Sequence, residues 1–427
     1  MVHPEFDDRQ SYLAFLETQA TLPPGFSVAT TRIAFTPAER PSLEPYRMNL
    51  SLIVADKPTE KFGALFTKNA FPGAPVILGR ERMDGQLQGL LVNNKIANVR
   101  SRTGIEDARR LTAALGSATQ IPEEALLSVS TGIIGWALPV PEMEAAIPKL
   151  CDTLHAGSAL DVAQAIMTTD SYPKIRRIPV GAGSIVGIAK GAGMIEPNLA
   201  TMLVFLLTDL DVSREQLGRA LADAVGGSFN CISVDGDMST SDMVVLMSSA
   251  KAPPPAPDEF TTALSELCGA LARDVVRNGE GTGHVMEVTV TGLKDDDVAR
   301  DTAKAVVNSP LVKTAVYGND PNVGRLLSSV GDYLGTRGIS VDAGSVRIEL
   351  GGELVFSSGA FMLDREKEIR LSDYLKHTAL NPRVTGYPQH QRTVEIAITC
   401  GDGDGCATVW GSDLSDQYVH ENADYRT

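Results

Sequence analysis

The chain has 427 residues, of which 21% are charged and 5% aromatic, and this composition is typical of a soluble α/β enzyme and excludes a fibrous or disordered protein. The formal net charge of −15 argues against nucleic acid as a partner, because phosphate recognition requires clustered lysine and arginine side chains. Residues 1–24 lack the apolar stretch of a signal peptide, and no run of about 20 apolar residues could form a membrane helix, so we expect a cytoplasmic protein.

The first two-thirds of the chain contain patterns of both strands and helices. Nearly continuous apolar or β-branched runs predict buried strands, and apolar residues spaced three and four apart predict helices. The strands are expected at 48–55, 87–94, 184–188 and 200–208, and the helices at 106–115, 142–150, 215–225 and 259–278.

The last third of the chain shows the same two patterns. Strands are expected at 286–291, 346–350, 354–357, 393–399 and 407–410, and a helix at 297–307. The polar segment 364–392 predicts a helix followed by a long surface excursion. Gly401-Asp-Gly-Asp-Gly, between two predicted strands, indicates a hairpin turn, since glycine and aspartate tolerate positive φ.

Two further features indicate structural rather than chemical roles. The chain has five cysteines, an odd number without C-x-x-C spacing, which indicates buried thiols and neither a disulfide framework nor a zinc site. The stretch Asp235-Gly-Asp-Met-Ser-Thr-Ser-Asp is superficially similar to a calcium loop, but it lacks the glycine and the distal glutamate of that pattern. We expect a buried, hydrogen-bonded turn there and no metal site.

One stretch, residues 187–205, places Thr201 between a turn rich in glycine and proline and an apolar strand. On its own this pattern predicts only a residue at a turn or at the start of a strand. The glycines do not form a phosphate loop, because the G-x-G-x-x-G register is absent and Lys190 does not stand in a G-x-x-x-x-G-K-[ST] motif.

The same stretch carries a resemblance to a known family. Residues 189–203 resemble, almost residue for residue, the self-cleavage segment of the ornithine acetyltransferases, which are glutamate N-acetyltransferases. Further blocks occur in that family's order and together span nearly the whole chain. These blocks are Ser130-Thr-Gly-Ile-Ile-Gly, Met167-Thr-Thr-Asp-Ser-Tyr-Pro-Lys, Phe229-Asn-Cys-Ile-Ser-Val-Asp-Gly-Asp, Asn308-Ser-Pro-Leu-Val-Lys-Thr-Ala and Glu421-Asn-Ala-Asp-Tyr-Arg-Thr.

The resemblance implies that the precursor cleaves itself between Ala200 and Thr201. It would leave an α-chain of residues 1–200 and a β-chain of residues 201–427, which stay together and assemble as (αβ)₂ or larger oligomers. Thr201 would then be the nucleophile of a ping-pong acyl transfer, with its freed α-amine as the base. The resemblance also implies layered sheets with flanking helices, the α/β fold of the ornithine acetyltransferases and DmpA-like proteins, with a smaller C-terminal α/β lobe from about residue 297. It implies no metal and no organic cofactor.

Site residues follow from the same correspondence. Thr131 and Gly132 match the family's oxyanion-hole pair. The positions that resemble the family's substrate-binding residues are Thr168, Lys190, Thr201, Glu280, Asn422 and Thr427. Their chemistry suits an amino acid, because Lys190 can pair with a carboxylate and Glu280 with an ammonium group.

One segment departs from the family pattern and leaves the substrates open. Asn93-Asn-Lys-Ile-Ala-Asn carries Lys95 and Ile96 where the family has glycine and asparagine. The leading hypothesis is acetyl transfer between an N-acyl amino acid, such as N-acetylornithine or N-acetylglutamate, and the α-amine of glutamate or ornithine. The alternatives are a paralogue with another acyl donor or acceptor, an amidohydrolase that uses water as acceptor, and a scaffold or amino-acid sensor without turnover.

Overall fold

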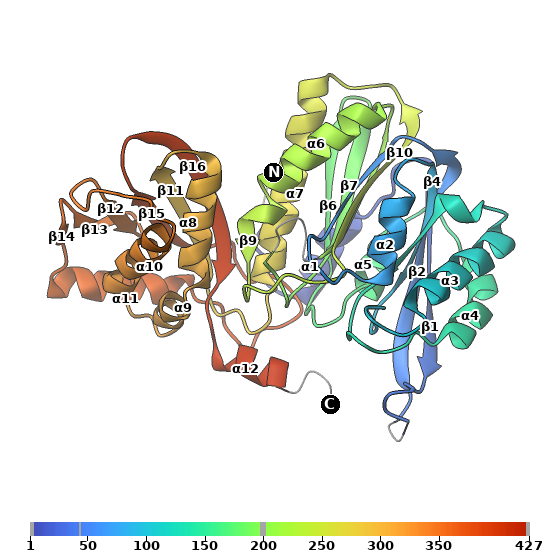
Figure 1. Ribbon diagram of the computed structural model, residues 1–427, viewed down its shortest axis with the longest axis horizontal. Coiled ribbons are helices and arrows are strands. Elements are labelled where there is room, and N and C mark those ends of the chain that lie inside the picture. The colour runs from blue at the N-terminus through green and yellow to red at the C-terminus, as the bar shows by residue number, and fades with distance from the viewer. Residues whose placement is uncertain (1–3, 42–43, 197–201, 424–427) are drawn as a thin grey trace.

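The computed structural model describes residues 4–41, 44–196 and 202–423, which form three sheets with flanking helices (Figure 1). The first sheet has four strands in the order β1-β2-β4-β5. Neighbouring strands are antiparallel except β4 and β5, which are parallel. The strands are β1 (Phe26–Phe35), β2 (Tyr46–Thr59), β4 (Leu87–Asn93) and β5 (Leu126–Ser130).

The second sheet has five strands in the order β3-β10-β8-β7-β6. Only the central pair, β8 and β10, is parallel. The strands are β3 (Phe62–Phe66), β6 (Lys174–Val180), β7 (Gly183–Lys190), β8 (Leu203–Leu210) and β10 (Met243–Ala252).

The two sheets pack face to face, and the sequence of β8 shows why. Its side chains alternate between two apolar layers, as the period of two in a strand requires. Leu203, Phe205 and Leu207 belong to the core between the sheets, whereas Val204 and Leu206 belong to the core beneath the helices. Each such side chain contributes about 1.5–3 kcal/mol when it is fully buried. Both faces of the strand are therefore fixed by packing.

Helices cover the outer faces of both sheets, giving four layers (Figure 1). α6 and α7 pack on the second sheet, and α3 and α4 pack on the first. α6 begins with a capping box in which the side chains of Ser213 and Gln216 each accept the other's backbone N–H. The helices of this larger unit are α1 (Arg9–Gln19), α2 (Ala74–Glu81), α3 (Gly104–Thr119), α4 (Val140–Asp152), α5 (Leu160–Ala165), α6 (Arg214–Gly226) and α7 (Pro257–Arg277).

The third sheet forms the smaller lobe and has seven strands in the order β14-β13-β12-β15-β11-β16-β9. Its strands are β9 (Ile232–Ser233), β11 (Val285–Gly292), β12 (Arg347–Leu350), β13 (Glu353–Ser357), β14 (Ala360–Phe361), β15 (Val394–Thr399) and β16 (Gly403–Ser412). The lobe's helices are α8 (Asp296–Asn308), α9 (Pro310–Tyr317), α10 (Val323–Thr336) and α11 (Arg365–Thr378). β9 joins this sheet from within the larger unit, the lobe's first long strand, β11, starts at Val285, and residue 297, near which we expected the lobe to begin, lies in α8.

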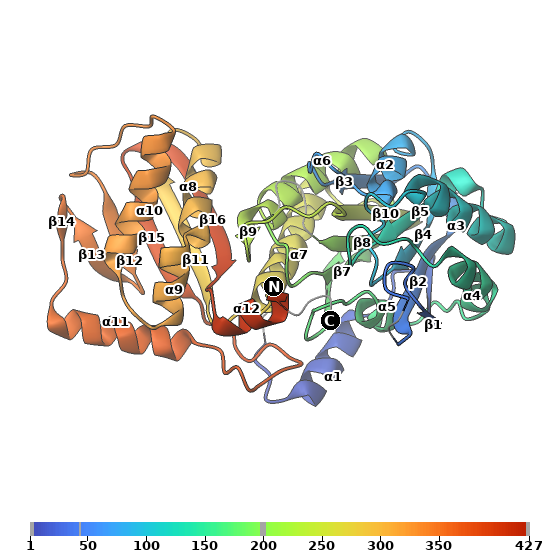
Figure 2. The ribbon, with the colours of Figure 1, turned by 60° about the horizontal axis from the view of Figure 1, so that its bottom comes forward.

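After β16 the chain leaves the smaller lobe and returns toward the larger unit as α12 (Asp416–Ala423), as Figure 2 shows. The long segment between α11 and β15 lies beside α1 in the same view, and the Tyr387 hydroxyl donates a hydrogen bond to the Asp7 carbonyl at 2.9 Å. The polar segment at 364–392 is therefore a helix followed by a surface excursion, as predicted. No helix among the described residues is long and apolar enough to cross a membrane.

Most of the predicted elements are present, but the hairpin turn predicted at Gly401–Gly405 is wrong. β15 and β16 are not neighbours, because β11 lies between them and pairs with both. The glycines instead allow close approach as the chain crosses the end of β11. A Cβ atom on Gly292 would lie 2.1 Å from the Gly401 carbonyl oxygen, and one on Gly405 would lie 2.3 Å from the Asp295 carbonyl oxygen. The strand predicted at 200–208 is described from Leu203 onward.

Candidate active site

A cleft of about 380 Å³ brings together five of the residues expected at the site: Gly132, Thr168, Lys190, Glu280 and Asn422. An adjoining cavity shares Gly132 and Lys190 with the cleft and is also lined by Thr131 and Met202. The expected nucleophile Thr201, the cleavage residue Ala200 and the substrate-binding residue Thr427 lie outside the described residues. Met202 directly follows Thr201, so the chain re-enters the described structure beside Thr131 and Gly132.

The turn Thr131-Gly132 follows β5, and its backbone geometry requires glycine. Gly132 has a φ of 128°, and a Cβ atom there would lie 2.1 Å from the carbonyl carbon of Lys95. The Thr131 N–H donates to the Asn93 carbonyl at 3.1 Å, so it is already used. Within the described chain, the Gly132 N–H and the Thr131 hydroxyl form no hydrogen bond, so each of these two cavity-lining residues has a free donor.

The segment 93–98, which departs from the family pattern, packs against this turn. Lys95 has a φ of 77°, and its carbonyl accepts the N–H of Ile133 at 2.8 Å. Ile96 is fully buried and forms a β-bridge with Thr131. The Lys95 side chain lines an outer cavity together with Thr168. The altered segment therefore shapes both the turn and the rim of the cleft.

Lys190 ends β7 and is 9% exposed. It forms no ion pair with any residue that the structure describes, so its ammonium group can accept a carboxylate ligand. Asp170, whose carboxylate interacts electrostatically with Lys190, is hydrogen-bonded to other groups. It accepts hydrogen bonds from Lys174 Nζ at 2.5 Å, from the Gly191 N–H at 2.8 Å and from the Thr168 N–H at 3.1 Å.

Asp170 is fully buried, and it connects two parts of the site. Burial alone would raise the pKa of its carboxyl group, but the ammonium groups of Lys174 and Lys190 and the hydrogen bond from Gly191 hold that pKa well below its usual range. Asp170 thereby fixes Thr168 against the end of β7. No role for Asp170 was predicted from the sequence; the available signal was a carboxylate four residues before Lys174, inside a block shared with the family.

Glu280 lies just beyond the end of α7. Its N–H donates to the Ala192 carbonyl at 2.9 Å, and its carboxylate accepts the side-chain amide of Asn422 at 2.9 Å. The carboxylate lies against Gly193, where a Cβ atom would be only 2.3 Å from Glu280 Oε2. The charge of Glu280 is thus held at the cleft, and α12 supplies its partner.

The segment that leads to Glu196 is held by a second carboxylate. Asp235 accepts the N–H of Met194 at 2.6 Å and the N–H of Ile195 at 2.8 Å. Met194 has a φ of 56°, so this is a sharp turn. Burial raises the pKa of Asp235, although the backbone hydrogen bonds oppose the shift. The turn predicted around Asp235 is hydrogen-bonded as expected, but the prediction that it is buried is wrong, because Gly236 and Asp237 are exposed at the surface.

Glu196, the last described residue before the gap at 197–201, is held by the smaller lobe. Its carboxylate pairs with Lys304 Nζ at 3.0 Å and accepts the side-chain amide of Asn308 at 3.1 Å. Asn308 Oδ1 in turn accepts the hydroxyl of Ser233 at 2.6 Å. Since Lys304 and Asn308 belong to α8, the smaller lobe contacts the chain next to the expected cleavage point.

The model of the ArgJ family matches residues 40–427 of this chain. The chain belongs to the ArgJ family. Two relatives are each 36% identical to it: the arginine biosynthesis bifunctional protein ArgJ 2 of Nostoc sp., over 96% of this chain and 99% of the relative, and the glutamate N-acetyltransferase Oat2 of Streptomyces clavuligerus, over 88% and 92%. A solved structure of the arginine biosynthesis bifunctional protein of Bacillus halodurans, 33% identical, covers 51% of this chain and 97% of its own chain with a TM-score of 0.45.

Membership of the ArgJ family makes this chain an N-acetyltransferase, and the family acts on amino acids and N-acyl amino acids. The geometry of the cleft agrees with this class of substrate, because Lys190 and Glu280, which carry opposite charges, line one cavity beside the turn Thr131-Gly132.

Replacement of Asp170 with asparagine should lower the free energy of unfolding by about 3–5 kcal/mol, because it leaves Lys174 buried without a counter-charge. In the unsubstituted protein the folded state binds the Asp170 proton less tightly than the unfolded state does. The stabilisation that ionised Asp170 gives the folded state is therefore complete above a pH of about 4, the ordinary aspartate pKa, and is lost as the pH falls further. The free energy of unfolding of Asp170→Asn, measured by urea denaturation, should fall less steeply over this pH range than that of the unsubstituted protein.

The control is Asp373→Asn, which removes an exposed ion pair with Lys376 on α11. It should change stability by less than about 1 kcal/mol. Equal effects of the two substitutions would show that the buried Asp170 pair does not stabilise the site.

Proposed function

We propose that this ArgJ-family chain is a cytoplasmic, self-cleaving acetyltransferase that moves an acetyl group between N-acetylornithine or N-acetylglutamate and the α-amine of glutamate or ornithine. Thr201 is the nucleophile. One observation supports the proposal most directly: two adjoining cavities are lined by Thr131, Gly132, Lys190 and Glu280. Met202, the residue after Thr201, lines one of the same cavities.

The first reaction is self-cleavage between Ala200 and Thr201. The Thr201 hydroxyl attacks the carbonyl carbon of Ala200, the peptide C–N bond breaks, and an ester forms while the amine takes a proton. Water then hydrolyses the ester and leaves an α-chain of residues 1–200 and a β-chain of residues 201–427. The attack is intramolecular, so it gains a large effective concentration. The anchoring of residues 194–196 by Asp235 and α8 supports this step, because it limits the motion of the chain before the cleaved bond.

The second reaction is acetyl transfer in two half-reactions. The α-amine freed on Thr201, with an ordinary pKa of about 8, accepts the hydroxyl proton as Thr201 attacks the acetyl carbonyl. The Gly132 N–H and the Thr131 hydroxyl donate to the developing oxyanion, and one such donor is typically worth about 3 kcal/mol. The donor's amine leaves with a proton. The acceptor's α-amine then attacks the acetyl ester and regenerates Thr201.

Substrate orientation follows from the charges in the cleft. Lys190 pairs with the substrate carboxylate, and Glu280 pairs with an ammonium group. Thr168 and Asn422 line the same cleft and offer neutral hydrogen bonds, and Thr427 completes this set in the proposal. We propose that two αβ units associate as (αβ)₂ or as a larger oligomer, and that no cofactor takes part.

Replacement of Thr201 with alanine should abolish both cleavage and transfer, whereas Thr201→Ser, which keeps a hydroxyl, should retain both at reduced rates. Transfer is measured by incubating N-acetylornithine with isotopically labelled glutamate and following labelled N-acetylglutamate. A parallel incubation without an acceptor measures hydrolysis by water. Transfer at the unsubstituted rate by Thr201→Ala would exclude Thr201 as the nucleophile, and hydrolysis unaffected by glutamate would favour an amidohydrolase.

Removal of the ion pair between α8 and Glu196 should slow self-cleavage. Lys304→Met and Glu196→Gln each remove one charge of this pair, so residue 196 loses an anchor, and we expect cleavage about tenfold or more slower, as a loss of about 1.4 kcal/mol would give. The matched control is Lys294→Met, whose side chain is 87% exposed. Cleavage is followed by gel electrophoresis after synthesis of the precursor. Equal rates for Lys304→Met and Lys294→Met would contradict an anchoring role.

A further inference from the structure

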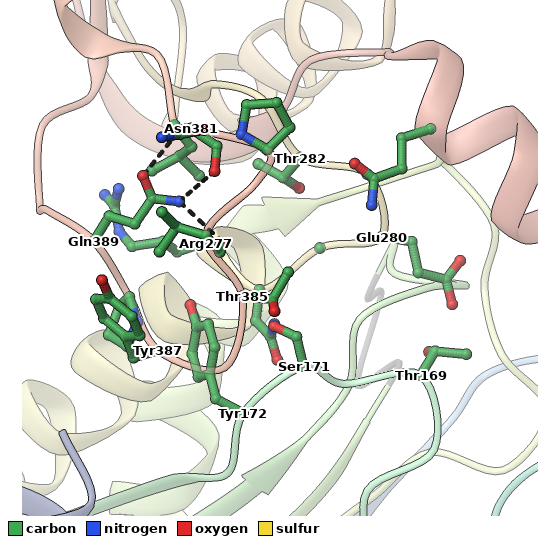
Figure 3. Close-up of a pocket in the computed structure, with 18 of the residues that line it drawn as sticks. Thr169, Ser171, Tyr172, Arg277, Glu280, Thr282, Asn381, Thr385, Tyr387 and Gln389 are labelled. Carbon is green, nitrogen blue, oxygen red and sulfur yellow. Dashed lines mark hydrogen bonds between the residues drawn. The ribbon is translucent and has the colours of Figure 1, made fainter. Parts of the chain in front are cut away.

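A second cavity, of about 100 Å³, adjoins the catalytic cleft and shares Thr169 and Glu280 with it (Figure 3). Its walls come from four segments that are distant in sequence: the turn before β6, the end of α7 with the residues that follow it, the excursion between α11 and β15, and α12. The excursion contributes Asn381, Thr385 and Gln389 to the wall, and Gln389 accepts the Asn381 N–H at 2.8 Å and donates to the Asn381 carbonyl at 2.9 Å.

Arg277 lines this cavity and is a buried cation without a counter-ion. It is 4% exposed and forms no ion pair with any described residue. Its only hydrogen bond within that part of the chain runs from Nη1 to the Arg392 carbonyl at 3.3 Å, and its buried Nε has no partner. Burial lowers the pKa of Arg277, but a guanidinium group stays charged in proteins.

The nearby carboxylates of Asp274 and Glu287 act on Arg277 electrostatically, but neither forms an ion pair with it. Asp274, one turn earlier on α7, is held by Arg176, which donates to both of its carboxylate oxygens at 2.7 Å. Glu287 accepts the indole N–H of Trp410 at 3.1 Å. An unpaired charge in a protein interior is costly, and buried charges are therefore normally paired. We therefore expect an anion from outside the chain to bind at Arg277.

Two other residues on the same wall also carry a buried polar atom without a partner. The hydroxyl of Tyr172 and Oδ1 of Asn278 form no hydrogen bond, although Nδ2 of Asn278 donates to the Ser171 hydroxyl at 2.6 Å. Tyr172 and Arg277 both belong to the wall of this cavity, as Figure 3 shows. Buried polar groups are nearly always hydrogen-bonded, and Arg277, Tyr172 and Asn278, which all line this cavity, each carry a buried polar atom without a partner among the described residues.

The acidic residues of the wall limit the charge of that ligand. Glu280 lies against Gly193 and accepts a hydrogen bond from Asn422, so its carboxylate is directed to the catalytic cleft. Glu421 lies at the rim and disfavours a second negative charge. Serine, threonine and glutamine side chains supply neutral hydrogen bonds. The cavity therefore fits one carboxylate with a short polar or apolar body.

We propose that this cavity is a second ligand site, distinct from the catalytic cleft, which binds a small monocarboxylate through Arg277. The carboxylate is the missing counter-ion of the guanidinium group. Because the segment from Asn278 to Glu280 lines this cavity and carries a residue of the catalytic cleft, occupancy of one site is coupled to occupancy of the other, and the coupling is reciprocal.

The test is equilibrium dialysis of the purified full-length protein against radiolabelled propionate at fixed ionic strength, with unlabelled succinate as a competitor. We expect saturable binding that succinate displaces poorly. Arg277→Met should weaken propionate binding at least about tenfold, which corresponds to 1.4 kcal/mol, whereas Arg219→Met, on the exposed face of α6, should leave it unchanged.

Two further variants separate the outcomes. Thr385→Phe fills the cavity from an exposed loop without touching Arg277, so it tests the site even if Arg277→Met does not fold. Lys190→Met removes the cation of the catalytic cleft and should leave propionate binding intact. The proposal is overturned if the unsubstituted protein does not bind propionate, or if binding survives Thr385→Phe and is lost in Lys190→Met, which would place the anion in the catalytic cleft.

Discussion

The burial of β8 on both faces determines where the active site lies. Every residue from Leu203 to Leu210 is buried, and the strand is enclosed between the first sheet on one side and α6 and α7 on the other. A strand packed in this way cannot shift its register by one residue, because all its side chains would exchange faces. The residue before it, Met202, is consequently fixed at the cavity that holds Thr131 and Gly132. The proposed nucleophile therefore stands two residues before a strand that is buried on both faces.

The groups around this point are positioned by carboxylates that do not themselves face the substrate. Asp170 holds Thr168 and the backbone after Lys190, and Asp235 holds the turn at Met194. Both bind backbone N–H groups, so they fix the main chain rather than a single side chain. The site is therefore assembled from turns at strand ends, and buried charges set their geometry.

The sequence supplied the family and the residues that face the cleft, because these lie in long, specific blocks such as 189–203. Most helices and buried strands were also predictable, since their apolar periodicity is strong. Other features were not accessible, because they depend on contacts between distant segments. The ion pair between Glu196 and Lys304 joins the two units. The absence of an ion pair at Arg277 within the described chain is recognised only in the structure, where Asp274 is bound to Arg176 instead. The hairpin expected at Gly401–Gly405 failed for the same reason: local turn chemistry does not reveal that β11 separates the two strands.

The central claim is that Thr201 becomes the N-terminal residue of a separate β-chain and then carries the acetyl group. The most direct measurement is the intact mass of the purified protein under denaturing conditions, before and after incubation with N-acetylglutamate and, separately, with N-acetylornithine. The account predicts two fragments divided between Ala200 and Thr201, with one acetyl group added to the fragment that begins at Thr201. A single uncut chain without an adduct would contradict it.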